Sequence, residues 1–336
     1  MKVAFITYQY PPKSFWGGSF YALKLTHALE DLGVDLLRIG PSHMQDEGIK
    51  LTARNFFHFA WKARKQIGGA DLVHGNILAD VFVTSVPCVT TMHHAQKFDY
   101  PCSSMRKTIY EKVEERCFKK ARKVITDSMA SLRELEALHG DGKICSVPLG
   151  VDLVKTDVGD PRKVLCATGL SARKGVELLL HTAKELGNRA DFYITGNGGE
   201  KQRLESLAAR MKLKNMHFLG IVGGEELSLL YSQCGICIIP SIHEGFGLPI
   251  LEGMAHKKAV IATNTGIAPE IIENGKNGFL INERNPKLVS SLIIKLAEDE
   301  KLFKKVAQRA RETSRKFSWH KTARETIKVY KMALSE

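Results

Sequence analysis

The sequence predicts an α/β protein built from two doubly wound parallel sheets. The chain has 336 residues, more than a single domain usually contains. Short apolar runs typical of buried strands alternate with segments whose apolar residues recur at helical spacing, which implies parallel strands with helices on both sheet faces. The alternation restarts after the segment 148–152. We therefore expect one domain over residues 1–152 and a second over 153–318, with the polar, turn-rich stretch 150–162 as the linker.

In the first half, the expected elements begin with a buried apolar strand. The next segment places Phe20, Leu25 and Leu29 at helical spacing and stops at Gly33. A later helix is long, amphipathic and basic. The expected strands are 2–7, 34–39, 71–74, 88–92, 124–126 and 144–147, and the expected helices are 19–32, 56–67, a short stretch at 81–83, and 106–123.

The second half repeats the alternation of strands and helices, and glycine and proline mark the ends of its elements more clearly. From Lys301 onward the chain reads as helical, ending in an amphipathic helix that begins at Trp319. The expected strands are 164–168, 192–195, 217–219, 236–239, 260–263 and 279–281, and the helices between them are 176–186, 200–212, 225–232, 248–255, 268–273 and 286–298.

Charge is the one unusual bulk property. The formal net charge is +13, whereas the content of 44% hydrophobic and 25% charged residues is that of an ordinary globular protein. This excess of cations predicts an anionic partner without choosing one. No apolar run has the length of a membrane span and the chain starts directly with a strand-like segment, so we expect a cytoplasmic protein with reduced, buried cysteines.

The segment 238–252, IIPSIHEGFGLPILE, predicts a strand–loop–helix junction. Pro240 closes the strand, and Pro249 fits the first turn of a helix because its missing N–H would have no partner there. Bare amides at a helix start, reached through Gly245 and Gly247, favour an anion such as phosphate. Glu244 beside them accepts hydrogen bonds from hydroxyl groups. Phosphate together with hydroxyls indicates a sugar nucleotide, although an ordinary glycine-rich turn has the same appearance.

Five other loops follow expected strands, where ligands of open parallel sheets bind. Gly17-Gly18 forms either a flexible turn or a backbone nest for a diphosphate. His93 ends a strand and is either structural or in contact with a sugar. Arg173 and Lys174 precede a helix start, where the helix dipole disfavours cations unless phosphate lies between or the pair is solvated. Two further turns are candidates on position alone: Gly196-Asn197 and Pro269-Glu270.

Taken together, these motifs resemble the large family of retaining glycosyltransferases called family 4 or group 1, which has two Rossmann-like domains facing across a cleft, the GT-B fold. The most specific match is PSIHEGFGLPILEGMA, whose Glu244 and Glu252 fit the family's Glu-x7-Glu element. The segments PLGVD, ARKG, GNGG, GIAPEIIENGKNGFL and the final FSW also fit, in family order. The resemblance covers nearly the whole chain, and it implies that the last helix, 319–334, packs back on the first domain.

The resemblance implies roles for individual residues. Glu244 would hold hydroxyls of the donor sugar, Glu252 the ribose, and Lys174 the diphosphate, while His93 would contact the sugar near the reacting centre. The remaining implied donor contacts are the nest of Gly17 and Gly18, the loop of Gly196 and Asn197, the base loop of Ile221 and Val222, the amides of Gly245, Phe246, Gly247 and Leu248, and the helix start of Pro269 and Glu270. The first domain would bind the acceptor and the second the nucleotide sugar.

One departure from the family matters for activity. The family usually has a Gly-Arg pair where this chain has Thr168-Gly169, so the expected arginine is missing at Gly169, and Arg173 would supply the charge. The predicted function is a hexosyltransferase that moves a sugar from a nucleotide diphosphate to an acceptor hydroxyl of a glycan, lipid-linked or small-molecule acceptor. A non-catalytic sugar-nucleotide-binding protein and a sugar-nucleotide epimerase on the same scaffold are the alternatives.

No cofactor is expected beyond the donor itself, and no catalytic metal, because no DxD-type motif stands where it could hold one. Nucleic acid is not an expected partner, since the basic residues are not grouped with stacking aromatics. The basic stretches 56–65 and 106–123 suggest docking at an anionic inner membrane surface. A solvated charged helix face explains them equally well.

Overall fold

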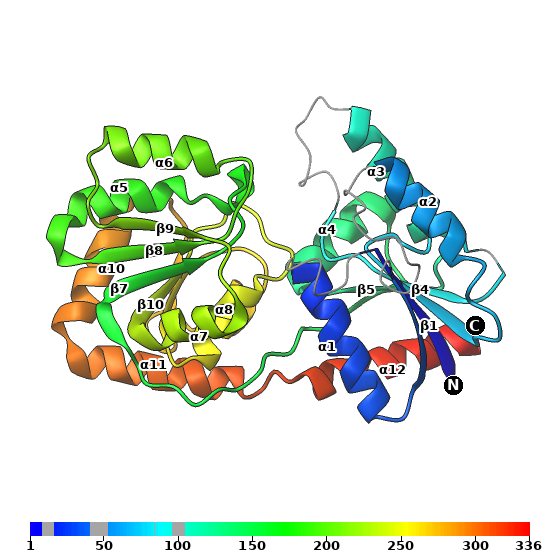
Figure 1. The fold of residues 1–336 in the computed structure, drawn as a ribbon. Helices are drawn as coiled ribbons and strands as arrows, with labels where there is room; N and C mark the ends of the chain where they lie inside the picture. Colours follow the sequence, from blue (N-terminus) through cyan, green and yellow to red (C-terminus); the bar gives the residue numbers. More distant parts are fainter. Residues whose placement is uncertain (9–16, 41–52, 84, 96–104) are drawn as a thin grey trace. The chain divides into compact units, whose positions relative to one another are not determined.

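The computed structural model describes residues 1–8, 17–40, 53–83, 85–95 and 105–336. The chain divides into two compact units (Figure 1). Unit 1 comprises Met1–Gly150 and Ser318–Glu336, and unit 2 comprises Val151–Phe317. Each unit has its own sheet and core, and each is described by itself below.

Unit 1 is a six-stranded parallel sheet in the order β2-β1-β3-β4-β5-β6. Building outward from β1 in both directions is what makes the sheet doubly wound. Its strands are β1 (Lys2–Thr7), β2 (Asp35–Ile39), β3 (Leu72–Asn76), β4 (Cys88–Thr91), β5 (Lys123–Thr126) and β6 (Ile144–Ser146). Its helices are α1 (Gly17–Asp31), α2 (Ala53–Ala63), α3 (Met105–Lys120), α4 (Met129–His139) and α12 (Trp319–Ser335).

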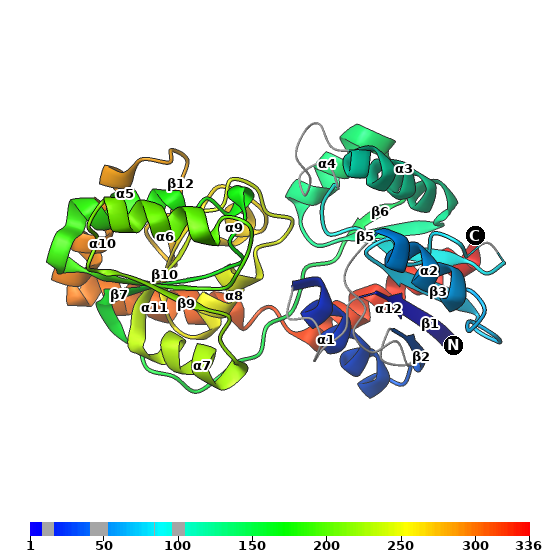
Figure 2. The ribbon, with the colours of Figure 1, turned by 45° about the horizontal axis from the view of Figure 1, so that its top comes forward.

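The last helix, α12, completes unit 1 although it is the most distant segment in sequence (Figure 2). It packs against α1 and reaches the sheet at β4 and β5. The hydroxyl of Tyr330 lies 2.6 Å from Nδ1 of the fully buried His74, and Thr322 donates to the carbonyl of Pro148 at 2.8 Å. Burial and the neighbouring charge of His93 lower the pKa of His74 to about 3, so the His74 ring is neutral.

Unit 2 is a second six-stranded parallel sheet, in the order β12-β11-β10-β7-β8-β9. Helices α5 and α6 cover one face, and α7 and α8 cover the other (Figures 1 and 2). The strands are β7 (Asp160–Ala167), β8 (Asp191–Thr195), β9 (Met216–Gly220), β10 (Cys234–Ile239), β11 (Ala259–Thr263) and β12 (Phe279–Ile281). The helices are η3 (Ala172–Lys174), α5 (Glu177–Leu186), η4 (Gly187–Arg189), α6 (Lys201–Arg210), α7 (Gly224–Gln233), α8 (Leu248–Ala255), α9 (Ala268–Ile271), α10 (Pro286–Glu298) and α11 (Glu300–Ser314).

The two doubly wound parallel sheets confirm the predicted fold class, and the differences are local. The helix expected over 106–123 ends at Lys120, because the next residues enter β5 and Lys123 pairs with Glu336 at 2.5 Å. The stretch 81–83 is part of a turn rather than a helix. Sequence reasoning missed α4, whose N-cap Ser128 accepts a hydrogen bond from the Ser131 amide. None of the described helices combines the length and apolar character that crossing a bilayer needs.

Candidate functional site

The segment predicted to bind an anion folds as a strand, a loop and a helix. Strand β10 ends at Ile239, Pro240 follows, and α8 begins at Leu248. Gly247 caps the helix with φ = 91°, a left-handed conformation that a residue with a Cβ adopts only at a cost. N–H groups at the start of a helix generally lack an acceptor within it, although here Pro249 has no N–H and Ile250 donates to the carbonyl of Gly247. The N-terminus of α8 therefore offers backbone N–H donors and the positive end of a helix dipole.

The loop before α8 is braced by the neighbouring junction after β11. The amide of Ile267 donates to the carbonyl of Phe246 at 2.8 Å, and Gly247 accepts from Ile250 at 2.9 Å. A Cβ at Gly266 would lie 2.3 Å from the carbonyl oxygen of Phe246, so only glycine allows this approach. The bracing places Pro269 and Glu270, in the first turn of α9, next to the loop that carries Glu244.

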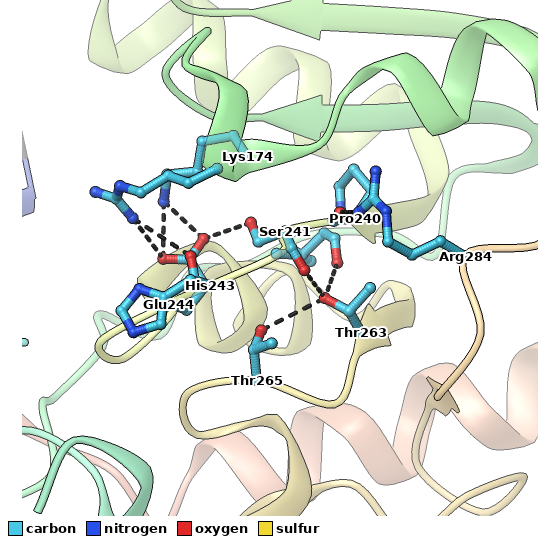
Figure 3. A network of polar contacts seen from close by, with 10 residues as sticks. Lys174, Pro240, Ser241, His243, Glu244, Thr263, Thr265 and Arg284 are labelled. Carbon is cyan, nitrogen blue, oxygen red and sulfur yellow. Dashed lines mark hydrogen bonds and ion pairs between the residues drawn. The ribbon is translucent and has the colours of Figure 1, made fainter. Parts of the chain in front are cut away.

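Lys174 and Glu244 form a close ion pair at the centre of this site (Figure 3). The Nζ of Lys174 lies 2.6 and 2.7 Å from the two carboxylate oxygens of Glu244. Ser241 donates to the same carboxylate at 2.6 Å, and Nη1 of Arg173 lies 3.8 Å from it. The side chain of Glu244 is only 6% exposed. The adjacent predicted residues Arg173 and Lys174 are thus brought to Glu244, which lies 70 positions after Lys174 in sequence.

The charge state of Glu244 follows from its partners. Burial alone would raise the pKa of this carboxyl group. The charges of Lys174 and Arg173 and the hydrogen bonds from Lys174 and Ser241 outweigh burial, so the pKa of Glu244 lies below its usual range. Glu244 is therefore ionised at neutral pH and can only accept hydrogen bonds.

A hydrogen-bonded frame fixes the two loops that carry this pair. The amide of Ile242 donates to the carbonyl of Arg173 at 2.7 Å, which ties η3 to the loop after β10. Thr263, at the end of β11, donates to the carbonyl of Ser241 at 2.5 Å, and Arg284 bonds the carbonyls of both Pro240 and Gly175 (Figure 3). The frame joins the carboxyl ends of β7, β10 and β11, the sheet edge where ligands of this fold class bind.

Glu252 lies one turn into α8, in a different environment from Glu244. Tyr231 donates to Oε2 of Glu252 at 3.2 Å, and the Tyr231 ring stacks on His256 at 4.2 Å. Burial raises the pKa of Glu252 to about 7; the Tyr231 hydrogen bond opposes this shift and the charge of Asp152 adds to it. Glu252 is thus close to half-protonated at neutral pH.

The other predicted residues of unit 2 lie in loops that follow β8 and β9. Gly196 has φ = 105°, and a Cβ there would lie 1.9 Å from the carbonyl oxygen of Thr168. The carbonyl of Asn197 accepts from the Leu170 amide at 2.9 Å. Ile221 is 69% exposed, an unusual state for a large apolar side chain, and Val222 beside it is partly buried. These loops also stand at the carboxyl ends of strands.

In unit 1, His93 lies at the centre of a polar cluster. Its Nδ1 is 2.5 Å from Oδ2 of Asp127, its Nε2 is 3.0 Å from Oδ1 of Asn76, and the Tyr21 ring packs edge-on at 4.9 Å. Gly18 belongs to the same cluster, because a Cβ on it would lie 3.6 Å from Nε2 of His93. Gly17, the first residue of α1, has no atom within 4 Å of its Cβ position.

Hydrogen bonding orients the groups around the His93 ring. Nδ2 of Asn76 donates to Oγ1 of Thr7 and to the carbonyl of Gly18, both at 3.1 Å. A carbonyl only accepts, so the amide nitrogen of Asn76 must face Gly18 and its oxygen must face His93. Nε2 of His93 therefore faces an acceptor, and Nδ1 lies against the carboxyl group of Asp127. Two acceptors placed at the two ring nitrogens suit an imidazolium.

Sequence reasoning missed several residues that complete these clusters. Asp127 is 1% exposed and precedes the N-cap of α4, where the helix dipole favours an anion. Asn76 ends β3, Thr263 ends β11, and Ser241 lies two residues after the last residue of β10. All four are polar residues at the carboxyl end of a strand, which is the signal that would have found them.

Both halves of the chain match models of glycosyltransferase families. A family model described as Glycosyl transferases group 1 matches residues 154–313, and one described as Glycosyltransferase Family 4 matches residues 17–155. An uncharacterised glycosyltransferase of Methanocaldococcus jannaschii is 24% identical over 99% of both chains. Another from the same organism is 34% identical but covers 47% of this chain and 44% of its own length.

Solved structures show the same fold. A sucrose-phosphate synthase from Thermosynechococcus elongatus superposes with a TM-score of 0.85, at 19% identity over 99% of both chains. The Anabaena protein HepE in complex with UDP-glucose gives a TM-score of 0.81 at 20% identity, over 98% of this chain and 99% of that one. Two six-stranded, doubly wound parallel sheets and these structural neighbours define a GT-B-like fold.

The family models together run from residue 17 to residue 313. The chain belongs to the glycosyl transferases group 1, or glycosyltransferase family 4. It is a nucleotide-sugar glycosyltransferase of this family, for which a retaining mechanism is typical.

Proposed function

We propose that the protein transfers a hexosyl group, with retention of anomeric configuration, from a nucleotide diphosphate sugar to an acceptor hydroxyl of a glycan, lipid-linked or small-molecule acceptor. The observation that carries the proposal is the Lys174–Glu244 pair at the sheet edge that also carries the helix start at Leu248. A cation and helix amides suit a diphosphate, and a carboxylate suits sugar hydroxyls. The named relatives include a mannosyltransferase and a structure bound to UDP-glucose, which supports a hexosyl donor.

Each cluster has a part in the proposed reaction. The amides of Gly245–Leu248, with Lys174 and Arg173, bind the diphosphate, and Arg173 supplies the charge that the family carries at the position of Gly169. Glu244 accepts from hydroxyls of the transferred sugar and Glu252 from the ribose, while the exposed Ile221 offers an apolar surface to the base. In unit 1, His93 contacts the sugar and Gly17-Gly18 the diphosphate.

The chemistry follows from where charge develops. Breaking the bond between the anomeric carbon and phosphate leaves negative charge on the diphosphate and positive charge on the ring. Fixed cations and helix-end amides stabilise the first, and they do so without reorganising during the reaction. The acceptor hydroxyl then forms the new glycosidic bond on the face that the phosphate leaves, and its proton passes to the departing phosphate.

Donor binding is expected to depend on pH through Glu252. Ribose hydroxyls bind the carboxylate, so binding requires the ionised form and releases a proton. With a pKa of about 7 in the free protein, the affinity for a nucleotide sugar should fall about tenfold between pH 8 and pH 6. A nucleotide sugar is the proper probe because its doubly esterified diphosphate does not titrate in this range. Calorimetric titration with UDP-, GDP- and ADP-sugars measures the effect and identifies the base.

Glu252→Gln is the matched control, since it keeps the shape of the side chain and removes its titration. Its affinity should be weaker and independent of pH. The bound sugar is then offered to acceptors, and the anomeric configuration of the product is read by NMR. A protein that binds a donor but neither transfers nor hydrolyses it would be the non-catalytic alternative. Donor isomerised without an acceptor would indicate an epimerase, and failure of every nucleotide sugar to bind would overturn the proposal.

We also propose that unit 1 docks on an anionic membrane through the end of α2. Trp61 is 42% exposed, with the cations of Arg64 and Lys65 at 5.3 and 4.4 Å from its ring. An exposed tryptophan flanked by cations suits a headgroup layer. In α3 part of the charge is paired within the helix, since Lys119 contacts Glu115 at 2.5 Å, and the side chain of Arg106 lies outside the described residues.

Liposome flotation tests the docking. We expect the protein to float with vesicles that contain anionic lipid and not with neutral ones, and Trp61→Ala with Lys65→Gln to abolish flotation. Equal behaviour with both vesicle types would discard docking and leave a solvated helix face.

A further inference from the structure

A second cationic site lies in unit 2, away from the donor cluster. A cavity of about 490 Å³ is bounded by the segment before β7, the turn between α8 and β11, and one face of α11. These segments precede β7 and β11, so the cavity stands at the amino-terminal edge of the parallel sheet, whereas Lys174 and Glu244 follow β7 and β10 at its carboxyl-terminal edge. The charged residues that line it are Lys155, Asp157, Lys257, Arg311 and Arg315.

The charges of this cavity are not balanced. Four of its side chains are cationic and one is acidic. Arg311 lies in the last turn of α11 and Arg315 is its C-cap, four residues on with helical dihedral angles, a spacing at which like charges repel. Burial, followed by the charge of Arg315, lowers the pKa of Arg311.

Arg311 also has an unused donor. Its Nη2 donates to the carbonyl of Val154 at 2.7 Å, which orients the guanidinium. Its Nη1 is buried and has no hydrogen-bond partner within the part of the chain that the structure describes. A buried N–H group without a partner costs stability, and an anion in the cavity would satisfy it.

Lys257 contributes a cation to the cavity at a position where the backbone favours glycine. It has φ = 57°, a left-handed conformation, directly after the C-cap of α8, where glycine is the usual residue. Below it, the fully buried Lys258 donates to the carbonyl of Asp157 at 2.6 Å. The segment before β7 that lines the cavity is thus held by two hydrogen bonds, from Lys258 to the carbonyl of Asp157 and from Arg311 to the carbonyl of Val154.

We propose that this cavity binds a small phosphate ester, at a site separate from the donor site. Two guanidinium groups on one helix face suit the oxygens of a phosphoryl group, and a phosphate monoester carries close to two negative charges at neutral pH. The volume is within the range of small-molecule sites, so the remainder of the ligand also has room. The site does not depend on the proposed transfer reaction.

Calorimetric titration of the full chain with inorganic phosphate, a hexose 6-phosphate and the uncharged hexose tests the proposal. Both phosphates should bind, the hexose should not, and affinity should fall with ionic strength. Arg315→Gln should weaken binding at least tenfold and leaves the Arg311–Val154 bond intact. Lys257→Gly should weaken it too, without loss of thermal stability, because glycine accepts the left-handed backbone.

Two variants separate this site from other causes. Lys305→Gln removes an exposed cation of α11 outside the cavity and should change nothing. Arg173→Gln alters the donor cluster and should also leave this affinity unchanged. If Arg173→Gln weakens binding while Arg315→Gln does not, the phosphate occupies the donor site and the proposal is wrong. No saturable binding of either phosphate, or equal binding of the plain hexose, would overturn it as well.

Discussion

Replacing Lys174 with methionine is expected to destabilise unit 2 by about 3–5 kcal/mol, because it leaves the carboxylate of Glu244 buried without its main partner. Glu244 is 6% exposed and Lys174 15% exposed, so water screens the pair little. The loss corresponds to a fall of roughly 10 °C in the unfolding temperature. Thermal and urea unfolding at pH 7 measure it. Lys184→Met, an exposed lysine on α5, is the control and should cost almost nothing.

The double variant distinguishes a charge effect from lost packing. Glu244→Gln alone should cost less than Lys174→Met, and combining the two should recover most of the stability, because no uncompensated charge remains. An additive double variant would show that Lys174 contributes only packing. Both single variants should also lower transfer about a hundredfold or more, the effect of removing one preorganised charge contact.

The pH dependence has a definite sign. The pKa of Glu244 is depressed in the folded protein, so the pair contributes stability above the unfolded pKa, about 4.3, which is lost as pH falls through the folded value. Without Lys174, burial raises the pKa instead. The difference in stability between wild type and Lys174→Met should therefore shrink as pH falls from 7 towards 5.

Asp127→Asn is expected to lower turnover about tenfold to a hundredfold, the size of effect seen when the carboxylate that orients a metal-binding histidine is removed. The carboxylate of Asp127 accepts from Nδ1 of His93 and stabilises the imidazolium, whereas an amide stabilises it much less. Asp127 acts through His93 and is thus a positioning residue. Imidazole nitrogen shifts in NMR should show a doubly protonated His93 ring in the wild type and a neutral one in the variant at the same pH.

Ser131→Ala is the matched control. Ser131 donates to the backbone carbonyl of His93 at 2.9 Å and does not touch the ring, so its loss should leave the protonation state unchanged. A ring that stays doubly protonated in Asp127→Asn would refute the role given to Asp127. Loss of turnover with unchanged NMR shifts would point to a structural cause.

The sequence was enough to predict the fold class and the strand–loop–helix junction of the candidate site, because both depend on local signals. Pro240, Gly247 and Pro249 mark where a strand stops and a helix starts, and the structure has α8 beginning at Leu248. The pairing of Lys174 with Glu244 depends instead on β7 lying beside β10, a neighbour relation that crosses 70 residues and that no local pattern reports.

The residues that sequence analysis did not find also depend on contacts between segments that are far apart in the chain. Asp127 and Asn76 are ordinary polar residues until β3, β4 and β5 align and bring both to the His93 ring. The second cationic cavity is assembled from positions 155, 257, 311 and 315, which have no common spacing in the chain. Repulsion between Arg311 and Arg315 is readable from sequence, but the buried, unpartnered nitrogen is not.

The dependence of unit 1 on α12 has a consequence for how the protein is made. Chains emerge from the ribosome from their first residue, and domains generally fold as they appear. Here unit 1 cannot form its complete core at first, because His74 makes its hydrogen bond with Tyr330 only after Tyr330 has been synthesised. Unit 2, in contrast, is one uninterrupted stretch of the chain. The later half of the chain is therefore complete before the earlier half can close its core.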